Sequence, residues 1–397
     1  MDGSYLLDWA NLLLRWAHVV FAIAWIGSSF YFVWLDNHLT PPQDESLKAK
    51  GVNGELWAVH GGGFYNPQKY FVGPQGMPTG ALHWFYWESY STWLSGFALF
   101  TLLYLFNASS FLVDKRVHDW PPAFAVAAAL GFLAVGWGVY DLICRLAGRN
   151  RDGTIGGDLR VGVLIFAFVV LASWAACQLF AGRAAFLIVG AMLATVMSAN
   201  VFFWIIPGQR TVVADLQAGR QPDPVHGQRG KQRSVHNTYF TLPVLVAMLS
   251  NHYSLLYAHP QNWLVLVLLM LLGALARLFF VWRHKGRTSW GLLAACGALV
   301  VLLVVWLAPR PSASAAAPPA ATLAQVQAVV QQRCVMCHGA EVVNKNVRLH
   351  TPELIRQHAQ QMLQQAVVSR TMPLNNATQM TEDERLLIKR WVETGAP

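Results

Sequence analysis

Long apolar runs dominate this chain of 397 residues, and they restrict what it can fold into. A helix needs roughly 20 mainly apolar residues to cross a bilayer. About eight segments meet this requirement, at residues 9–35, 82–106, 121–146, 160–180, 184–206, 239–257, 262–283 and 289–308. In lipid, only structures that satisfy their own backbone hydrogen bonds can span the membrane, so these runs predict helices. We therefore expect an all-α fold, with a polytopic membrane domain over residues 1–308.

The composition agrees with a lipid environment. Charged residues make up 12% of the chain, whereas a soluble protein usually carries about a quarter. The net charge of +9 could suggest a nucleic-acid partner. However, the basic residues lie in short loops between apolar runs, where membrane topology explains them. We expect contact with lipid and no nucleic acid.

The loops predict how the chain is oriented. Lys and Arg gather after the third, fifth and seventh apolar segments, at Arg149, Arg151, Arg210, Arg220, Arg229, Lys231, Arg233, Arg283, Lys285 and Arg287. The opposite loops carry fewer, namely Lys115, Arg116 and Arg183. Basic loops favour the cytoplasm, which places both chain ends outside. The long connection over residues 36–81 then lies inside, and its glycines and aromatic residues indicate a folded, functional segment.

The C-terminal part differs from the rest. Residues 309–322 are rich in Pro and Ala and predict an extended tether. Residues 323–397 are polar and helical, as in a small soluble domain. Cys334, Cys337 and His338 form the pattern C-x-x-C-H, which attaches c-type haem. A zinc site or a redox dithiol is the alternative, but zinc needs a second ligand pair and this segment has no other Cys. We predict one covalent haem c, with His338 as an iron ligand.

Met372 is predicted as the second iron ligand. It stands in T-M-P-L, outside any helical pattern, and the following proline favours an extended backbone. Met362 and Met380 are competitors, and Met362 lies on a predicted helix that suits packing. The pair Thr381 and Glu384 forms a capping box that opens a closing helix. This small helical layout resembles class I cytochrome c over about the last 75 residues.

Histidines in and near the apolar segments fall at two depths. His18 and His252 are expected near the outer face, while the histidines at 60, 83 and 236 are expected near the inner face. About 30 Å of hydrocarbon would separate the inner group from an outer haem, which is too far for one direct electron transfer. We therefore hypothesise a b-type haem held by His18 and His252. The alternative is that both bind no metal and form hydrogen bonds between helices.

Three motifs identify a resemblance. V-H-G-G-G-F-Y at residues 59–65, L-H-W-F-Y-W-E-S-Y-S-T-W-L-S-G at 82–96 and S-V-H-N-T-Y-F-T-L-P at 234–243 resemble the bacterial membrane-bound urate hydroxylases, whose eight-helix domain is fused to cytochrome c. The resemblance covers nearly the whole chain. It implies oxidation of urate to 5-hydroxyisourate, with electrons leaving through haem c to a terminal oxidase or a soluble cytochrome. It also implies a multi-pass protein of the bacterial inner membrane with its haem domain in the periplasm.

The inner polar residues are the candidates for the urate site. Ionisable groups within a membrane are costly and are functional candidates by default. Proton acceptors for the hydroxylation would come from His60, His83, Glu88 and His236. Cationic, amide and aromatic contacts to urate would come from Tyr65, Lys69, Arg210 and Asn237. Lys69 and Arg210 fit equally well as topology signals.

Other functions also fit parts of the pattern. A dehydrogenase for quinol or another small molecule would pass electrons to the same cytochrome. A non-catalytic membrane electron shuttle is possible, although one helix would suffice as its anchor. A transporter with a redox sensor is a third option, but an inverted repeat is not evident in the sequence.

Overall fold

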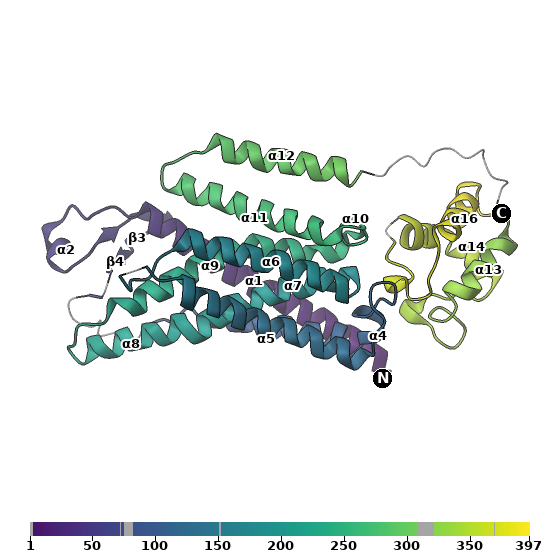
Figure 1. The fold of residues 1–397 in the computed structure, drawn as a ribbon, viewed down its shortest axis with the longest axis horizontal. Helices are drawn as coiled ribbons and strands as arrows, with labels where there is room; N and C mark the ends of the chain where they lie inside the picture. Colours follow the sequence, from purple (N-terminus) through teal and green to yellow (C-terminus); the bar gives the residue numbers. More distant parts are fainter. Residues whose placement is uncertain (1–2, 72, 75–81, 151, 309–320, 369) are drawn as a thin grey trace.

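The computed structural model describes residues 3–71, 73–74, 82–150, 152–308, 321–368 and 370–397. Most of these residues are helical, as predicted. Long helices run alongside one another in an elongated bundle, and a group of short helices lies beyond one end of it (Figure 1). The predicted tether at 309–322 falls almost entirely outside the described residues.

Each predicted apolar segment contains a helix of the bundle. These helices are α1 (Gly3–His38), α3 (Trp87–Phe100), α5 (Pro122–Ala147), α6 (Asp158–Leu179), α7 (Gly182–Asn200), α9 (Pro224–Leu249), α11 (Asn262–His284) and α12 (Trp290–Trp306), with α8 (Ile206–Gln217) continuing from α7. By length and composition, 5 helices of the described chain can cross a membrane: α1, α5, α6, the α7–α8 stretch and α11. Helix α12 is apolar but shorter. The total of eight spans stays a prediction.

The predicted segment 239–257 differs most from the structure. Helix α9 begins at Pro224, because the Asp223 side chain caps it by accepting a hydrogen bond from the Val225 backbone N–H. Its polar first half has no apolar pattern, so the sequence placed the start too late. After Leu249 the chain turns through η3 (Ser250–His252) and α10 (Ser254–Tyr257). His252 therefore lies in a turn and not within a long helix.

Two π-helical segments interrupt the long helices. They are η1 (Thr101–Leu105), after α3, and η2 (Val201–Ile205), between α7 and α8. Such segments shift the register of the side chains and often occur at functional sites. Helix α7 lies at the centre of the bundle, and Phe186, Ile188 and Val189 on it are fully buried. The short helix α4 (Ala108–Phe111) connects η1 to α5.

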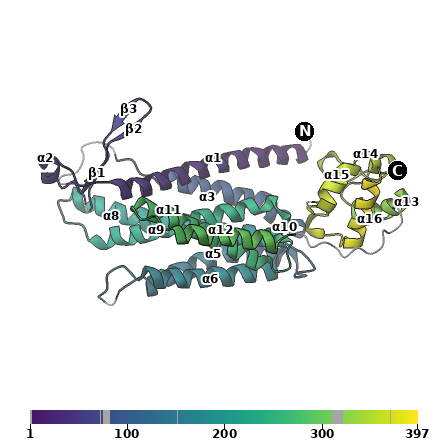
Figure 2. The same ribbon diagram turned by 90° about the horizontal axis from the view of Figure 1, so that it is seen from above.

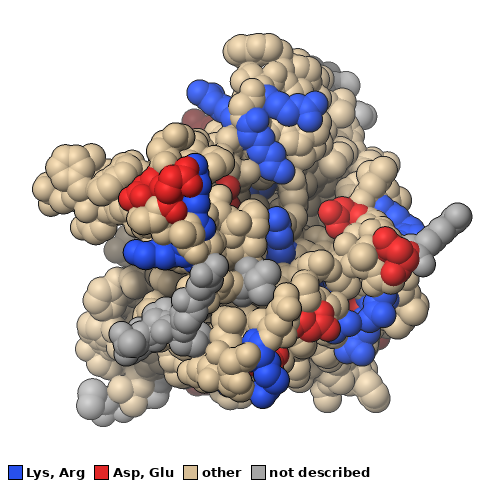
Figure 3. Space-filling view, turned by 90° about the vertical axis from the view of Figure 1, so that its left-hand side faces the viewer, with Lys and Arg blue, Asp and Glu red and all other residues tan. Residues whose placement is uncertain are grey.

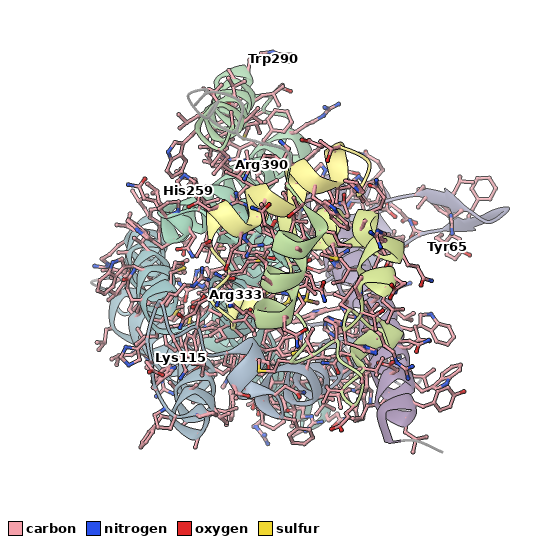
Figure 4. The ribbon with its side chains drawn as sticks, turned by 90° about the vertical axis from the view of Figure 1, so that its right-hand side faces the viewer. Tyr65, Lys115, His259, Trp290, Arg333 and Arg390 are labelled. Atoms are coloured by element: carbon pink, nitrogen blue, oxygen red, sulfur yellow. The ribbon has the colours of Figure 1, made fainter. Side chains whose placement is uncertain are left out.

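The bundle has two distinct ends, which we name the terminal end and the loop end. At the terminal end, α1 begins and residues 321–397 lie beside it (Figures 1 and 2). Lys115 belongs to this end (Figure 4). The loop end holds the 36–86 connection, α8 and the α11–α12 turn, and Figure 3 shows many Lys and Arg side chains on it. The basic loops predicted to share one side therefore do lie at one end.

The loop end carries a small folded segment after α1. Helix α2 (Glu45–Ala49) is followed by β1 (Gly54–Glu55), which pairs antiparallel with β4 (Gln68–Lys69). Strand β2 (Ala58–His60) pairs with β3 (Gly63–Tyr65). Gly61 and Gly62 form the hairpin turn with φ of 57° and 81°, a conformation that glycine adopts without strain. The 36–81 connection is thus folded over its described residues.

Residues 321–397 form a second hydrophobic core. Their helices are α13 (Leu323–Arg333), α14 (Pro352–Gln357), α15 (Ala359–Met362) and α16 (Glu382–Glu393), with the short 3-10 helices η4 (Asn344–Asn346) and η6 (Leu374–Asn376) and the π-helical segment η5 (Leu363–Val368). The predicted capping box of Thr381 and Glu384 opens α16. Trp391 on this helix is fully buried among the apolar side chains of α13 to α15.

Candidate functional site

A large cavity lies at the terminal end of the bundle. Its volume is about 1920 Å³. Side chains of α1, α3, α7 and α9 line one part of it, and side chains from residues 333–378 line the other. His18, His252, Cys334, His338 and Met372 all border this one space. The cavity therefore brings the six residues predicted to bind haem together, since Cys337 also lines it.

His18 is held in a defined orientation on α1. Its Nδ1 lies 3.1 Å from the Thr92 carbonyl oxygen and 3.1 Å from the Ser95 hydroxyl oxygen. Because a carbonyl oxygen only accepts, Nδ1 carries the proton and Nε2 keeps its lone pair. A Cβ atom at Gly96 would lie 2.8 Å from His18 Cε1, so only glycine leaves room for the imidazole. One ring nitrogen is thus fixed and the other is available, which is compatible with a metal ligand and also with a hydrogen bond between helices.

His252 borders the same cavity from the turn after α9. Its side chain is exposed, in contrast to the half-buried ring of His18. The neighbouring Asn251 accepts hydrogen bonds from the Tyr104 hydroxyl and from Arg183 Nε, at 3.0 and 3.2 Å. These contacts tie the turn to η1 and α7.

The predicted haem motif forms the opposite wall of the cavity. His338 Nδ1 lies 3.2 Å from the Val347 carbonyl oxygen and donates to it, which leaves Nε2 available to a metal. Cys334 and Cys337 are free thiols. Burial raises the pKa of the Cys334 thiol to about 11. Both thiols and His338 border the cavity, as covalent attachment of a haem there would require.

Three methionines were candidates for the second iron ligand, and the structure separates them. Met380 is 3% exposed and Met362 is 6% exposed, and both pack in the second core. Met362 also borders the cavity, so its burial and not its position separates it from Met372. Met372 is 37% exposed and borders the cavity with His338. The Met372 backbone is fixed by Arg385, whose NH1 donates to the Met372 carbonyl oxygen at 2.9 Å and also to that of Ala366. Sequence reasoning missed Arg385, because a buried arginine on a polar helix gives no local signal.

A polar network lies in the half of the bundle nearer the loop end. Asp141 on α5 accepts hydrogen bonds from Arg233 NH2 at 2.8 Å, Arg145 Nε at 2.6 Å and Trp204 Nε1 at 2.8 Å. Both Asp141 and Arg233 are buried, at 5% and 4% exposure. The Arg233 guanidinium also lies 5.0 Å from the centre of the Tyr140 ring. We call this set the Asp141 network.

His236 and Asn237, both predicted as site residues, join the Asp141 network. His236 Nδ1 lies 2.8 Å from the Tyr140 hydroxyl. Asn200 Nδ2 donates to the same hydroxyl and to Asn237 Oδ1, each at 2.9 Å. The Tyr140 hydroxyl oxygen can also accept from His236 Nδ1–H, a tautomer that leaves the lone pair on His236 Nε2. Helices α5, α7 and α9 thus hold His236 in one orientation.

The other predicted urate-site residues lie at the loop end. His60 and Tyr65 are exposed on the β2–β3 hairpin, and Tyr65 projects beyond the bundle (Figure 4). Lys69 Nζ pairs with Asp36 at 2.5 Å. The remaining three are an exposed His83, whose ring packs on Phe85, a half-buried Glu88 in the first turn of α3, and an exposed Arg210 on α8.

The structure adds one residue that the sequence reasoning missed. Arg277 on α11 is only 4% exposed. Among the described residues, neither its Nε nor its NH2 has a hydrogen-bond partner. Its guanidinium carbon lies 4.1 Å from the centre of the Phe30 ring on α1. An arginine within the apolar run 262–283 was a visible signal, because ionisable residues inside a span are functional candidates.

Comparison with known proteins bears on the first 308 residues. A family model described as urate oxidase N-terminal matches residues 4–308, which include the cavity-lining part of the bundle, the Asp141 network and Arg277. Comparison with curated proteins and with solved structures gives no match for this chain. Since the model matches well over half of the chain, the protein belongs to the urate oxidase N-terminal family.

Proposed function

We propose that the protein is a membrane-bound urate hydroxylase that passes electrons to a covalent haem c at its C-terminus. The family match supports urate as the substrate. The observation that carries the electron path is the cavity, because it joins the interior of the bundle to Cys334, Cys337 and His338. The cytoplasmic side would be the loop end, and the haem domain would lie in the periplasm of a bacterial inner membrane.

The reaction is written as a two-electron oxidation. Urate and one water molecule give 5-hydroxyisourate, two protons and two electrons. Water forms the new C–O bond, and one proton must leave from that water. We assign this proton to His236 Nε2, because the contact of Nδ1 with Tyr140 at 2.8 Å fixes the ring. Glu88, His83 and His60 stay predicted acceptors nearer the loop end.

Cys334 and Cys337 would hold the haem c through thioether bonds, with His338 and Met372 as its iron ligands. When bound, such a haem accepts single electrons and passes them to a soluble cytochrome or a terminal oxidase. The protein contributes orientation: Val347 fixes the His338 ring, and Arg385 fixes the backbone of Met372. These contacts hold both ligand residues at the wall of the cavity.

We further propose that His18 and His252 hold a second, b-type haem in the same cavity. The support is the fixed Nδ1 of His18, the glycine that makes room for its ring, and the shared lining of the cavity. A bis-histidine haem is a one-electron carrier, which suits the splitting of an electron pair.

The decisive experiment adds urate to the purified full-length protein without oxygen. We expect prompt reduction of the haem c absorption bands and formation of 5-hydroxyisourate without peroxide. Reduction by a quinol and not by urate would replace this proposal with the quinol dehydrogenase. Peroxide formed in step with urate loss, with the haem bands unchanged, would contradict the electron path.

A second experiment counts the haems. Acid extraction should release one haem per chain, and one should remain covalently attached. The His18→Ala variant should lose the extractable haem and keep the covalent one. His118→Ala, at an exposed histidine of the terminal end, is the matched control and should keep both. Wild-type protein that yields covalent haem only would show that the bundle holds no b-type haem.

A further inference from the structure

Arg277 is buried inside the bundle. It precedes the end of α11 at His284 by seven residues, or roughly 10 Å at 1.5 Å per residue. A guanidinium has five N–H donors in one plane and stays charged in proteins. Within the described part of the chain, Nε and NH2 are enclosed and donate to no acceptor. We call these two groups the open donors of Arg277. Burying a charge is costly unless it is paired, so the open donors call for an acceptor.

The neighbours of Arg277 come from three helices that lie side by side in the bundle, α1, α9 and α11 (Figures 1 and 2). The Phe30 ring of α1 covers one face of the guanidinium, at 4.1 Å. Tyr239 of α9 and His284 of α11 lie within electrostatic range of it. A cation–π contact uses the face of the guanidinium, whereas its N–H groups point out in the plane. The contact with the Phe30 ring therefore does not use the open donors, which can still form hydrogen bonds in the guanidinium plane.

The helices around Arg277 pack closely together. One turn earlier on α11, Gly273 packs against α9, where an added Cβ would lie only 3.0 Å from the Pro243 nitrogen. This close approach fixes the two helices relative to each other. A binding group on such supports is preorganised, because little freedom is lost when the ligand binds.

Two explanations without a ligand are weaker. Long basic side chains in membranes often extend toward water, but Arg277 is 96% buried in the described structure, since its exposure is 4%. A purely structural arginine satisfies its donors, as Arg233 does with Asp141 at 2.8 Å in the neighbouring network. Arg277 follows neither pattern.

We propose that Arg277 binds the substrate, a planar purine-type anion. Its open donors would form hydrogen bonds to two acceptor atoms in the plane of that anion. This inference rests on the proposed function, and it places the urate site where α1, α9 and α11 meet. Arginine suits this role, because its planar fork matches carbonyl and oxyanion pairs that lysine cannot bind in the same way. Neighbouring Phe30 and Tyr239 provide aromatic surface for the purine.

The test uses urate as the probe and has two readouts, binding and thermal unfolding of the purified full chain without oxygen. In Arg277→Met, urate should bind roughly 100-fold more weakly, as expected when hydrogen bonds to a charged partner are lost. Without urate, the same variant should unfold at the wild-type temperature or above it, because a buried charge is removed. Arg277→Lys should fold normally and bind urate more weakly than wild type. Arg283→Met, at an exposed arginine on the same helix, is the control and should bind like wild type.

The possible results separate this inference from the proposed function. Wild-type binding in Arg277→Met would overturn the role of Arg277 while leaving urate oxidation intact. Loss of folding in both Arg277 variants would also overturn it, because the bundle itself would need the guanidinium. A wild-type protein that neither binds urate nor is reduced by it would contradict the proposed function.

Discussion

Two buried arginines on neighbouring helices have opposite surroundings. Arg233 on α9 and Arg277 on α11 are each 4% exposed. Arg233 donates to Asp141, which also accepts from Arg145 and Trp204. Arg277 has the Phe30 ring against its face, while its open donors lack an acceptor in the described residues. The contrast separates a buried arginine that has a carboxylate partner from one whose donors have none in the described residues, and the second is the candidate for ligand binding.

The two arginines should therefore contribute differently to the free energy of unfolding. The Asp141 network holds α5, α7 and α9 together and should be sensitive to the loss of any charged member. The region around Arg277 should tolerate loss of its charge, because the fold gains little from it. A similar trade between stability and activity is common at binding sites.

The largest expected effect comes from breaking the Asp141 network. Asp141→Ala leaves Arg233 buried without its carboxylate and should lower the free energy of unfolding by about 3–5 kcal/mol. Thermal unfolding in detergent measures this change. Asp119→Ala, which removes an exposed partner of Lys115, is the control and should change stability by less than about 1 kcal/mol. An equal loss of unfolding free energy in Asp141→Ala and Asp119→Ala would show that the buried network contributes no more than an exposed ion pair.

Arg385 extends the comparison to the second core. It is 5% exposed and, like Arg233, uses its donors, here on Met372, Ala366 and Asn376. Arg385→Leu should cost roughly 3 kcal/mol, because hydrogen bonds from a charged donor are lost. It should also loosen Met372 and shift the haem potential. Lys389→Leu, at an exposed position on the same helix, should leave both unchanged. A normal potential in Arg385→Leu would argue against its positioning role.

The Glu384 carboxylate gives a pH prediction for the same core. Burial acts to raise its pKa, but hydrogen bonds from Arg333 Nε and NH2, at 3.1 and 3.0 Å, outweigh it and hold the pKa below the usual value of 4.5. A lowered pKa contributes stability above the unfolded value, and this contribution is lost as the pH falls through the folded pKa. The second core should therefore become less stable below about pH 4.5. Glu384→Gln should flatten that decline in acid unfolding, and an unchanged slope would exclude the pair as its cause.

The smallest effect is expected at the ion pair between the two parts of the molecule. Lys345 Nζ lies 2.5 Å from Asp8 of α1, but the two side chains are 73% and 61% exposed. Exposed pairs contribute about 0–1 kcal/mol and are screened by salt. Lys345→Ala should change the rate of haem reduction by urate by no more than about twofold, a small factor on the free-energy scale. A large, salt-dependent loss would show that this pair positions the haem domain.

Much of the fold could be predicted because its signals are local. Apolar runs identified a helix in each predicted segment, and the capping box of Thr381 and Glu384 correctly marked the start of α16. The start of α9 was missed, because residues 224–238 are polar and carry no apolar pattern. Four of them, Gln232, Arg233, Asn237 and Thr238, are buried by packing against neighbouring helices. A long apolar helix can be recognised from its composition, whereas a polar helical segment that packs within the protein cannot.

The candidate sites divide in the same way. The spacing of Cys334, Cys337 and His338 follows from covalent chemistry along one chain segment, so the sequence alone determined that prediction. In the sequence, Arg233 counted only as a loop residue, and Arg277 within the apolar run 262–283 was overlooked. Only the tertiary structure decided that Asp141 from α5 meets the first and that the ring of Phe30 meets the second. Such partners come from distant segments, and their meeting depends on helix packing that no local pattern encodes.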